Sequence, residues 1–177
     1  MLKLIFCLSF SLSVAVIQAQ NHQGVQQLTP QVPLIVDDLL PDFCSYPRQE
    51  GAEITHLVMH FCSDAVINPE NPYQLHRIRE IFTEFKVSAH YLIDRQGNIY
   101  RLVPEARAAK HVSYGQLPNP PYHRDKLNHY AIGIELMGIG TTAEMMPFQI
   151  YQAHYNRIAP EHIGFTAAQY QSLVGLF

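Results

Sequence analysis

Two short apolar runs constrain the fold of this chain more than any other feature of its sequence. Residues 54–62 read ITHLVMHFC, and residues 131–138 read AIGIELMG. Each run is shorter than a typical free-standing helix and rich in branched apolar side chains, which favours a buried strand. The two runs therefore predict strands in the core of a sheet.

The segment that follows the first run has a helical pattern. Residues 71–85 read NPYQLHRIREIFTEF, so Asn71 is the expected N-cap and Pro72 the first helical residue. Its apolar residues recur at helical spacing: Leu75, Ile78, Phe82 and Phe85. We expect this helix to pack one face on the sheet.

Further along the chain, a hairpin and a second helix are expected. In residues 87–103, two β-rich runs flank residues 94–97, where Gly97 suits the left-handed position of a tight turn. Residues 138–164 show no clean pattern, which predicts an irregular insertion. Thr166 is the expected N-cap of a last helix, and its apolar pattern runs to Phe177 without a stop signal. We therefore expect the chain to be a fragment of a longer domain.

The N-terminal segment has the features of a secretory signal peptide. Lys3 precedes an apolar run from Leu4 to Ile17, and Ala19 is a small residue at a plausible cleavage point. Residues 1–19 therefore predict export, to the periplasm or the extracellular space, with an uncleaved N-terminal anchor as the alternative. No other segment is apolar enough to span a membrane. Residues 20–52, rich in Gln and Pro, predict an arm or linker before a domain at 53–177.

Charge and cysteine content exclude some functions and leave one question open. The formal net charge is -3 and no basic stripe is present, so the sequence gives no support for nucleic-acid binding. Export to an oxidising compartment makes a disulfide between Cys44 and Cys62 plausible. Two buried free thiols are an equally good interpretation.

The first run contains two histidines, His56 and His60, at a spacing of four residues. On a helix this spacing would let both bind one zinc ion. On a strand they are about 13 Å apart, because each residue rises about 3.3 Å. At most one of them is then a ligand of any one metal ion. Cys62 lies on the same face as His60, but about 6 to 7 Å away along the strand, which disfavours joint chelation.

Several motifs occur in an order that resembles a known family. These are VMHF (58–61), SAHYLIDRQGNIYRLVPE (88–105), AAKHVSYG (108–115) and HYAIGIELMG (129–138). Together they resemble the zinc-dependent N-acetylmuramoyl-L-alanine amidases of the type 2 family, whose fold is shared with phage lysozyme-type amidases and peptidoglycan recognition proteins. The resemblance covers about residues 53–177. It implies an α/β fold with a central mixed β-sheet flanked by helices.

The resemblance also implies roles for individual residues. His60 matches the first zinc ligand, and Glu135 matches the general base that acts on a zinc-activated water. His111 matches a histidine of the substrate groove, and His90 matches the hairpin histidine, beside or under the site. Asn128 matches an Asn that precedes the last strand. The resemblance thus implies that His111, Asn128 and His90 belong to the substrate-binding part of the site. Glu135 also stands out by itself, because an acid in an apolar strand is costly to bury unless it faces a polar cleft or a metal.

The sequence departs from the family pattern in two ways. Lys110 stands where the family has a Trp, so the groove wall and the substrate preference are expected to differ. The second and third zinc ligands of the family follow the helix that begins near Thr166, beyond the segment that ends at Phe177.

The resemblance implies an exported, Zn²⁺-dependent amidase. Its substrates would be peptidoglycan and muropeptides, cleaved at the amide between N-acetylmuramic acid and L-alanine. The alternative is a non-catalytic peptidoglycan-binding module of the same fold.

Overall fold

The structure, a computed structural model, describes residues 34–146 and 152–176. Within these residues, the main sheet has the strand order β1-β5-β4-β7-β3. Its strands are β1 (Ile35–Asp37), β3 (His56–Cys62), β4 (Tyr91–Ile93), β5 (Ile99–Arg101) and β7 (Ala131–Met137). Only the β4–β5 pair is antiparallel among the described strands of this sheet, so the sheet is mixed. The two apolar runs 54–62 and 131–138 are confirmed as strands, and they pair with each other.

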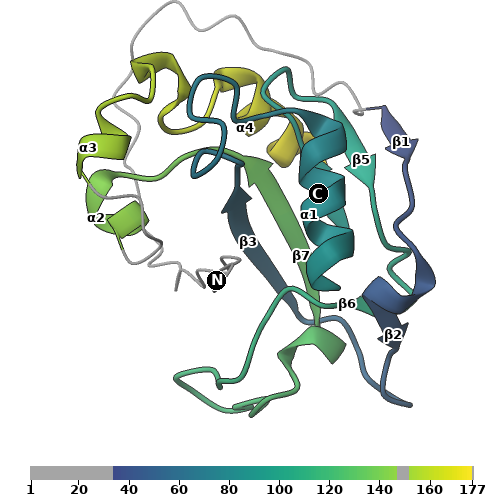
Figure 1. Ribbon diagram of the computed structural model, residues 1–177. Coiled ribbons are helices and arrows are strands. Elements are labelled where there is room, and N and C mark those ends of the chain that lie inside the picture. The colour runs from purple at the N-terminus through teal and green to yellow at the C-terminus, as the bar shows by residue number, and fades with distance from the viewer. Residues whose placement is uncertain (1–33, 147–151, 177) are drawn as a thin grey trace, which may run out of the picture.

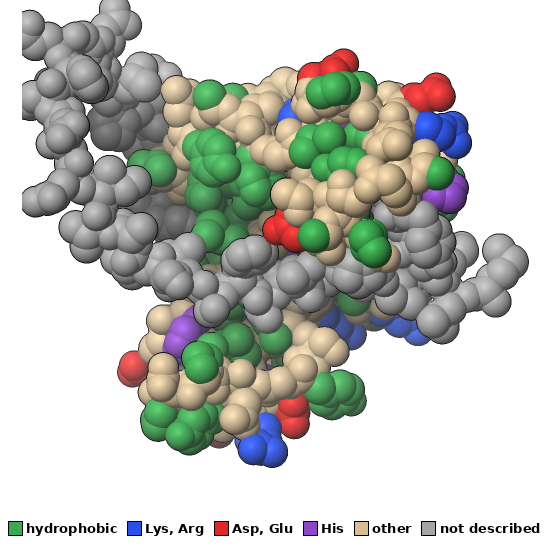
Figure 2. Space-filling model, turned by 90° about the vertical axis from the view of Figure 1, so that its left-hand side faces the viewer, with side chains coloured by type: hydrophobic (Ala, Val, Ile, Leu, Met, Phe, Trp, Pro, Cys, Tyr) green, Lys and Arg blue, Asp and Glu red, His purple; other side chains and the backbone are tan. Residues whose placement is uncertain are grey.

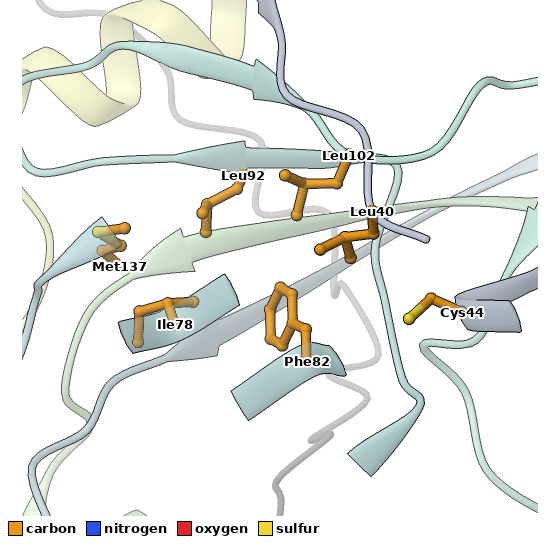
Figure 3. Packing of buried hydrophobic residues seen from close by; sticks show 7 residues of the cluster. All are labelled: Leu40, Cys44, Ile78, Phe82, Leu92, Leu102 and Met137. Carbon is orange, nitrogen blue, oxygen red and sulfur yellow. The ribbon is translucent and has the colours of Figure 1, made fainter. Parts of the chain in front are cut away.

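Helices pack on both faces of this sheet. Helix α1 (Leu75–Phe85) lies in front of the strands in Figure 1, and Figure 3 shows its Ile78 and Phe82 directed toward Leu92 and Leu102. Helix α4 (Ala167–Gly175) packs on the other face through a second apolar cluster. The expected α/β fold with a central mixed sheet between helices is confirmed.

The alternation of side chains along β7 decides what each face of the sheet receives. Ile132, Ile134 and Leu136 belong to the cluster that packs against α4, whereas Met137 belongs to the cluster under α1. Since successive side chains of a strand point to opposite faces, Glu135 points to the α1 side, like Met137. Every residue of β7 is buried, as the apolar run predicted.

The expected turn and cap residues are confirmed at two places. Strands β4 and β5 form the hairpin, and Gly97 has a φ of 85° in its turn. A side chain at Gly97 would also clash with Ala168 of α4, so glycine is required there for packing too. Thr166 caps α4 in a capping box with Gln169.

The predicted start of α1 is wrong by three residues. The helix begins at Leu75, not at Pro72, and its N-cap is Gln74 rather than Asn71. The Asn71 N–H donates to the Asn68 carbonyl, and the Asp64 N–H donates to the Pro72 carbonyl. These bonds hold residues 68–72 in turns against the end of β3, and this tertiary contact overrides the local capping signal.

Residues 34–52, which lie within the predicted arm, pack on the domain. Strand β1 pairs with β5, and β2 (Ser45–Pro47) pairs with β6 (Arg107–Ala109) in a small second sheet. The short helix η1 (Asp42–Cys44) lies between β1 and β2. Leu40 and Cys44 enter the core under α1 (Figure 3). The predicted signal peptide and residues 20–33 lie outside the described residues.

The segment predicted to be irregular contains short helices. They are α2 (Thr142–Met145), α3 (Gln152–Tyr155) and η4 (Pro160–His162). Together with residues from other segments they enclose a small core around Ile139, Met145 and Ile158. A further short helix, η2 (Leu127–His129), lies directly before β7 in the chain.

The structure answers the question about the cysteines. Cys44 is buried and Cys62 is half-buried, and both are free thiols, so no disulfide joins them. None of the helices in the described part of the chain has the length and apolar character needed to cross a membrane.

The edge strand β3 carries exposed apolar residues on its second face. Leu57 and Met59 are 52% and 37% exposed. Figure 2 shows the side of the molecule that lies on the left in Figure 1. Hydrophobic side chains gather over the upper half of this side of the molecule. The opposite face of the same strand, by contrast, carries the buried His60.

Candidate active site

The candidate site is built on the pairing of β3 with β7. His60 and Glu135 are register partners on these parallel strands, so their side chains lie side by side on the α1 face. Both residues are buried, with 3% and 4% of their surface exposed. The pair places an imidazole and a carboxyl group next to each other in an otherwise apolar environment.

His111 joins this pair from the segment that follows β6. Its Nδ1 lies 3.1 Å from Nε2 of His60, and the two rings meet edge to face. Burial is the main cause that holds the pKa of His111 well below its ordinary value, and the nearby His60 contributes in the same direction. His111 is therefore neutral at pH 7, and one of the two facing nitrogens donates to the other.

Gly133 makes room for the His111 ring. A Cβ atom at this position would lie 2.7 Å from Nδ1 of His111 and 2.6 Å from its Cδ2. Gly133 is two residues before Glu135 on the same face of β7, so any larger residue would push the ring away from His60. The glycine of the GIEL motif thus has a packing function in the site.

Asn128 fixes the backbone of the segment that carries His111. Its Oδ1 accepts hydrogen bonds from the N–H groups of His111 and Val112, at 3.3 and 2.8 Å. Its Nδ2 donates to the Val112 carbonyl at 3.0 Å. Asn128 therefore lies behind the site and positions His111 through the backbone.

His90 lies under the site and is completely buried. Its Nδ1 accepts from the Gly133 N–H at 2.9 Å, so Nε2 carries the proton and donates to the Arg107 carbonyl at 3.0 Å. Burial lowers the pKa of His90 to about 4, which keeps the ring neutral. The ring packs edge to face against His111, at 5.9 Å between centroids.

Arg48 is a half-buried cation that the sequence analysis missed. Its guanidinium donates to four backbone carbonyls: those of Glu105, Asn128, His129 and Ala131. It also lies 3.0 Å from Nε2 of His90. Because that nitrogen already carries a proton, this is a close contact of two donors rather than a hydrogen bond. Arg48 comes from the segment predicted to be an arm, and no local sequence pattern marks it.

The carboxyl group of Glu135 is strongly desolvated by burial. Burial raises its pKa to about 8, against the smaller opposing effect of a hydrogen bond with the Cys62 thiol. Its Oε2 has no hydrogen-bond partner among the described residues. A buried carboxyl oxygen without a partner is costly, so it is a recognisable feature of a functional site.

A pocket opens beside these groups. Its volume is about 340 Å³, and Glu135 and His111 form part of its wall. The last turn of α1, residues 86–88 and residues 110–113 form the rest of the lining. A substrate could therefore reach both Glu135 and His111 from this side.

His56 stands apart from the site. It faces Ala131 across the sheet, four residues before His60, and its ring contacts His123 at 5.5 Å between centroids. The strand therefore separates the two histidines, as its geometry predicted. Across residues 34–146 and 152–176, no group of three or more His, Cys, Asp or Glu is placed to hold a metal ion.

Comparison with solved structures shows the class of protein. The structure of AmpD, determined as a selenomethionine derivative, is similar over 78% of this chain and 69% of AmpD, with a TM-score of 0.50 and 25% identity. The fold is thus that of an amidase. The family model of N-acetylmuramoyl-L-alanine amidase matches residues 50–177, and the chain belongs to this family. The resemblance seen in the sequence motifs is confirmed.

Two further solved structures match with lower scores. The endolysin amidase LysCS from Clostridium intestinale has a TM-score of 0.46 and 20% identity, over 84% of this chain and 73% of its own. The hydrolase AmiA from Staphylococcus aureus, solved with its ligand, has a TM-score of 0.41 and 15% identity, over 62% of this chain and 46% of its own. No curated protein matches the sequence.

Proposed function

We propose that this protein hydrolyses the amide between N-acetylmuramic acid and L-alanine in peptidoglycan. One observation carries the proposal: a buried carboxyl group, Glu135, lies beside His60 and lines a pocket. Its Oε2 has no partner within the described part of the chain, so it is available to a water molecule or a substrate. Membership of the amidase family supports the reaction.

We also propose Zn²⁺ as the cofactor, with His60 as one of its ligands. A catalytic zinc takes three protein ligands, and the described residues provide no such group of three. The described residues therefore fit the metal only in part, through His60. When bound, zinc would supply Lewis-acid activation of water and of the scissile carbonyl.

Glu135 is the proposed general base and acid. A carboxyl group whose pKa is close to neutrality can accept a proton from water and later donate it to the leaving amine. A positive charge nearby would lower this pKa again, because it favours the carboxylate. The buried site thus allows Glu135 to exchange a proton in both directions.

His111 is the proposed substrate-binding group. It is neutral, it lines the pocket, and Gly133 and Asn128 fix its position. A neutral imidazole can donate to or accept from an amide of a bound peptide. His90 and Asn128 act through His111 and the backbone, as positioning groups.

The alternative is a peptidoglycan-binding module without activity. The observation that favours it is the absence of a three-ligand metal group among the described residues. The buried Glu135 favours the enzyme, because a module that only binds has less use for an acid that is costly to bury.

The decisive experiment uses the full chain, loaded with Zn²⁺, and a purified muropeptide. We expect release of the stem peptide, detected by mass spectrometry, and a loss of about 100-fold or more in Glu135→Gln. Glu161→Gln is the matched control, since Glu161 is exposed and far along the chain from the site strands. His60→Ala should lower the bound zinc measured by metal analysis. Binding of the muropeptide without turnover in the wild type would support the binding module instead.

We further propose that the protein is exported, to the periplasm or the extracellular space, through residues 1–19. Expression with the native N-terminus in a secreting host should yield mature protein that begins after Ala19. A protein that keeps its own N-terminus inside the cell would contradict export.

A further inference from the structure

Two cationic residues line the pocket beside the candidate site. Lys86 caps the C-terminus of α1 in a left-handed conformation, with a φ of 56°, and it is exposed. Lys110 directly precedes His111 and is half-buried. Both residues belong to the wall that also contains Glu135. The site therefore combines its acid with two positive charges that the proposed catalytic chemistry does not use.

Lys110 is held in place by the fold. Its N–H donates to Ser88 Oγ at 2.9 Å, and its carbonyl accepts from the Ser88 N–H at 3.1 Å. Its Nζ donates to the Phe43 carbonyl at 2.7 Å. An ammonium group has three N–H donors, so two remain for a ligand.

The charge of the pocket is positive whatever the protonation state of Glu135. Glu135 is the one acid in the lining, and Lys86 and Lys110 are the two lysines in it. Neither lysine forms an ion pair within residues 34–146 and 152–176. Phe82, Phe85 and Val112 supply apolar wall between the charges. The pocket thus suits a group that is anionic at one end and apolar along its stem.

We propose that this pocket binds a free carboxylate of the peptide that follows the scissile amide, with Lys110 and Lys86 as specificity-determining residues. The proposal rests on the function proposed above and names the substrate class within it. An amidase that cuts before an alanine has the remaining peptide next to its acid, and the two lysines line the same pocket as Glu135. A lysine pairs with a carboxylate as a compact charge, and an uncharged carboxamide lacks that attraction.

The experiment compares two muropeptides that differ in one group. One carries a free carboxylate on the residue after the alanine, and the other carries the carboxamide at that place. The dissociation constant of each is measured by calorimetry in Glu135→Gln, which cannot turn the ligand over if the proposed function holds, and kcat/KM is measured in the wild type. We expect the carboxylate to bind about tenfold more tightly than the carboxamide at low salt, with a smaller difference at high salt.

Variants separate this preference from general damage to the site. Lys110→Met and Lys86→Met, alone and together, should bring the affinity ratio toward one while affinity for the carboxamide stays unchanged. Lys126→Met is the matched control, because Lys126 is an exposed lysine that does not line the pocket, and it should keep the ratio.

The outcomes for the pocket and for the reaction are distinct. Equal affinity of Glu135→Gln for the two ligands when both lysines are present, or a preference that survives when both lysines are replaced, would overturn the inference even if the wild type hydrolyses both ligands. A carboxylate preference that the lysine variants remove would support the inference even in a protein that hydrolyses neither ligand. Failure of both ligands to bind would overturn it.

Discussion

His60 and Glu135 are register partners on two parallel strands, and both side chains lie under α1. Neither residue is near the other in the sequence. The pairing of β3 with β7 alone places them together, and a slip of one residue in either strand would turn one of them to the opposite face. The predictions that follow test this arrangement and the residues that hold it.

The buried carboxyl group should make stability depend on pH. Between its ordinary value of 4.5 and about 8, folded Glu135 keeps a proton that the unfolded chain releases. The free energy of unfolding should therefore fall as pH rises through this window, and Glu135→Gln should remove that part of the dependence. At pH 8 we expect the variant to be more stable than the wild type by on the order of 3 kcal/mol.

The measurement is urea denaturation of both proteins from pH 5 to pH 8, in the presence of a chelator. The difference between the two proteins isolates Glu135, since the buried histidines are common to both. A difference that does not grow with pH would show that Glu135 is not desolvated as described.

Arg48 should be a major contributor to stability. Its replacement by Met leaves four carbonyl groups near the site without their donor. We expect a loss of about 3 kcal/mol in the free energy of unfolding. Arg157→Met is the control, because Arg157 and Glu70 are exposed and 3.9 Å apart, and it should change stability by less than about 0.5 kcal/mol. Similar stability of the two variants would contradict the role of Arg48.

Asn128 should act through the backbone of the His111 segment. Asn128→Ala removes three hydrogen bonds and should cost about 1 to 3 kcal/mol. Asn128→Asp keeps the acceptor for the two N–H groups and loses the donor to Val112, so it should fall between Ala and the wild type. Thermal unfolding orders the three proteins, and an Asp variant less stable than the Ala variant would argue against this geometry.

Gly133 should be required for the position of His111. In Gly133→Ala the new Cβ meets the His111 ring, which has to move away from His60. We expect a loss of about 100-fold in kcat/KM, since small misplacements in an active site are costly. The histidine signals in NMR spectra should shift at the same time.

Gly138→Ala is the matched control for Gly133→Ala. A Cβ at Gly138 would meet the Phe165 ring rather than His111, so this variant is expected to lose stability while the His111 signals stay in place. If Gly138→Ala moves the His111 signals as much as Gly133→Ala does, the effect belongs to β7 as a whole.

The sequence by itself determined the local structure wherever short-range chemistry decides it. The β-branched runs gave β3 and β7, the helical spacing gave α1, and Gly97 and Thr166 marked a turn and a cap. The motifs also led to the family, which the comparison confirms. Their assigned roles, including zinc binding by His60, stay predictions.

Only the tertiary structure decided what those elements bring together. It placed Glu135 beside His60, set His111 over Gly133, and put Arg48 at the carbonyls that surround the site. It also moved the start of α1 and left Cys44 and Cys62 as free thiols. These facts depend on strand register and on contacts between distant segments, and a local pattern of residues carries no information about either.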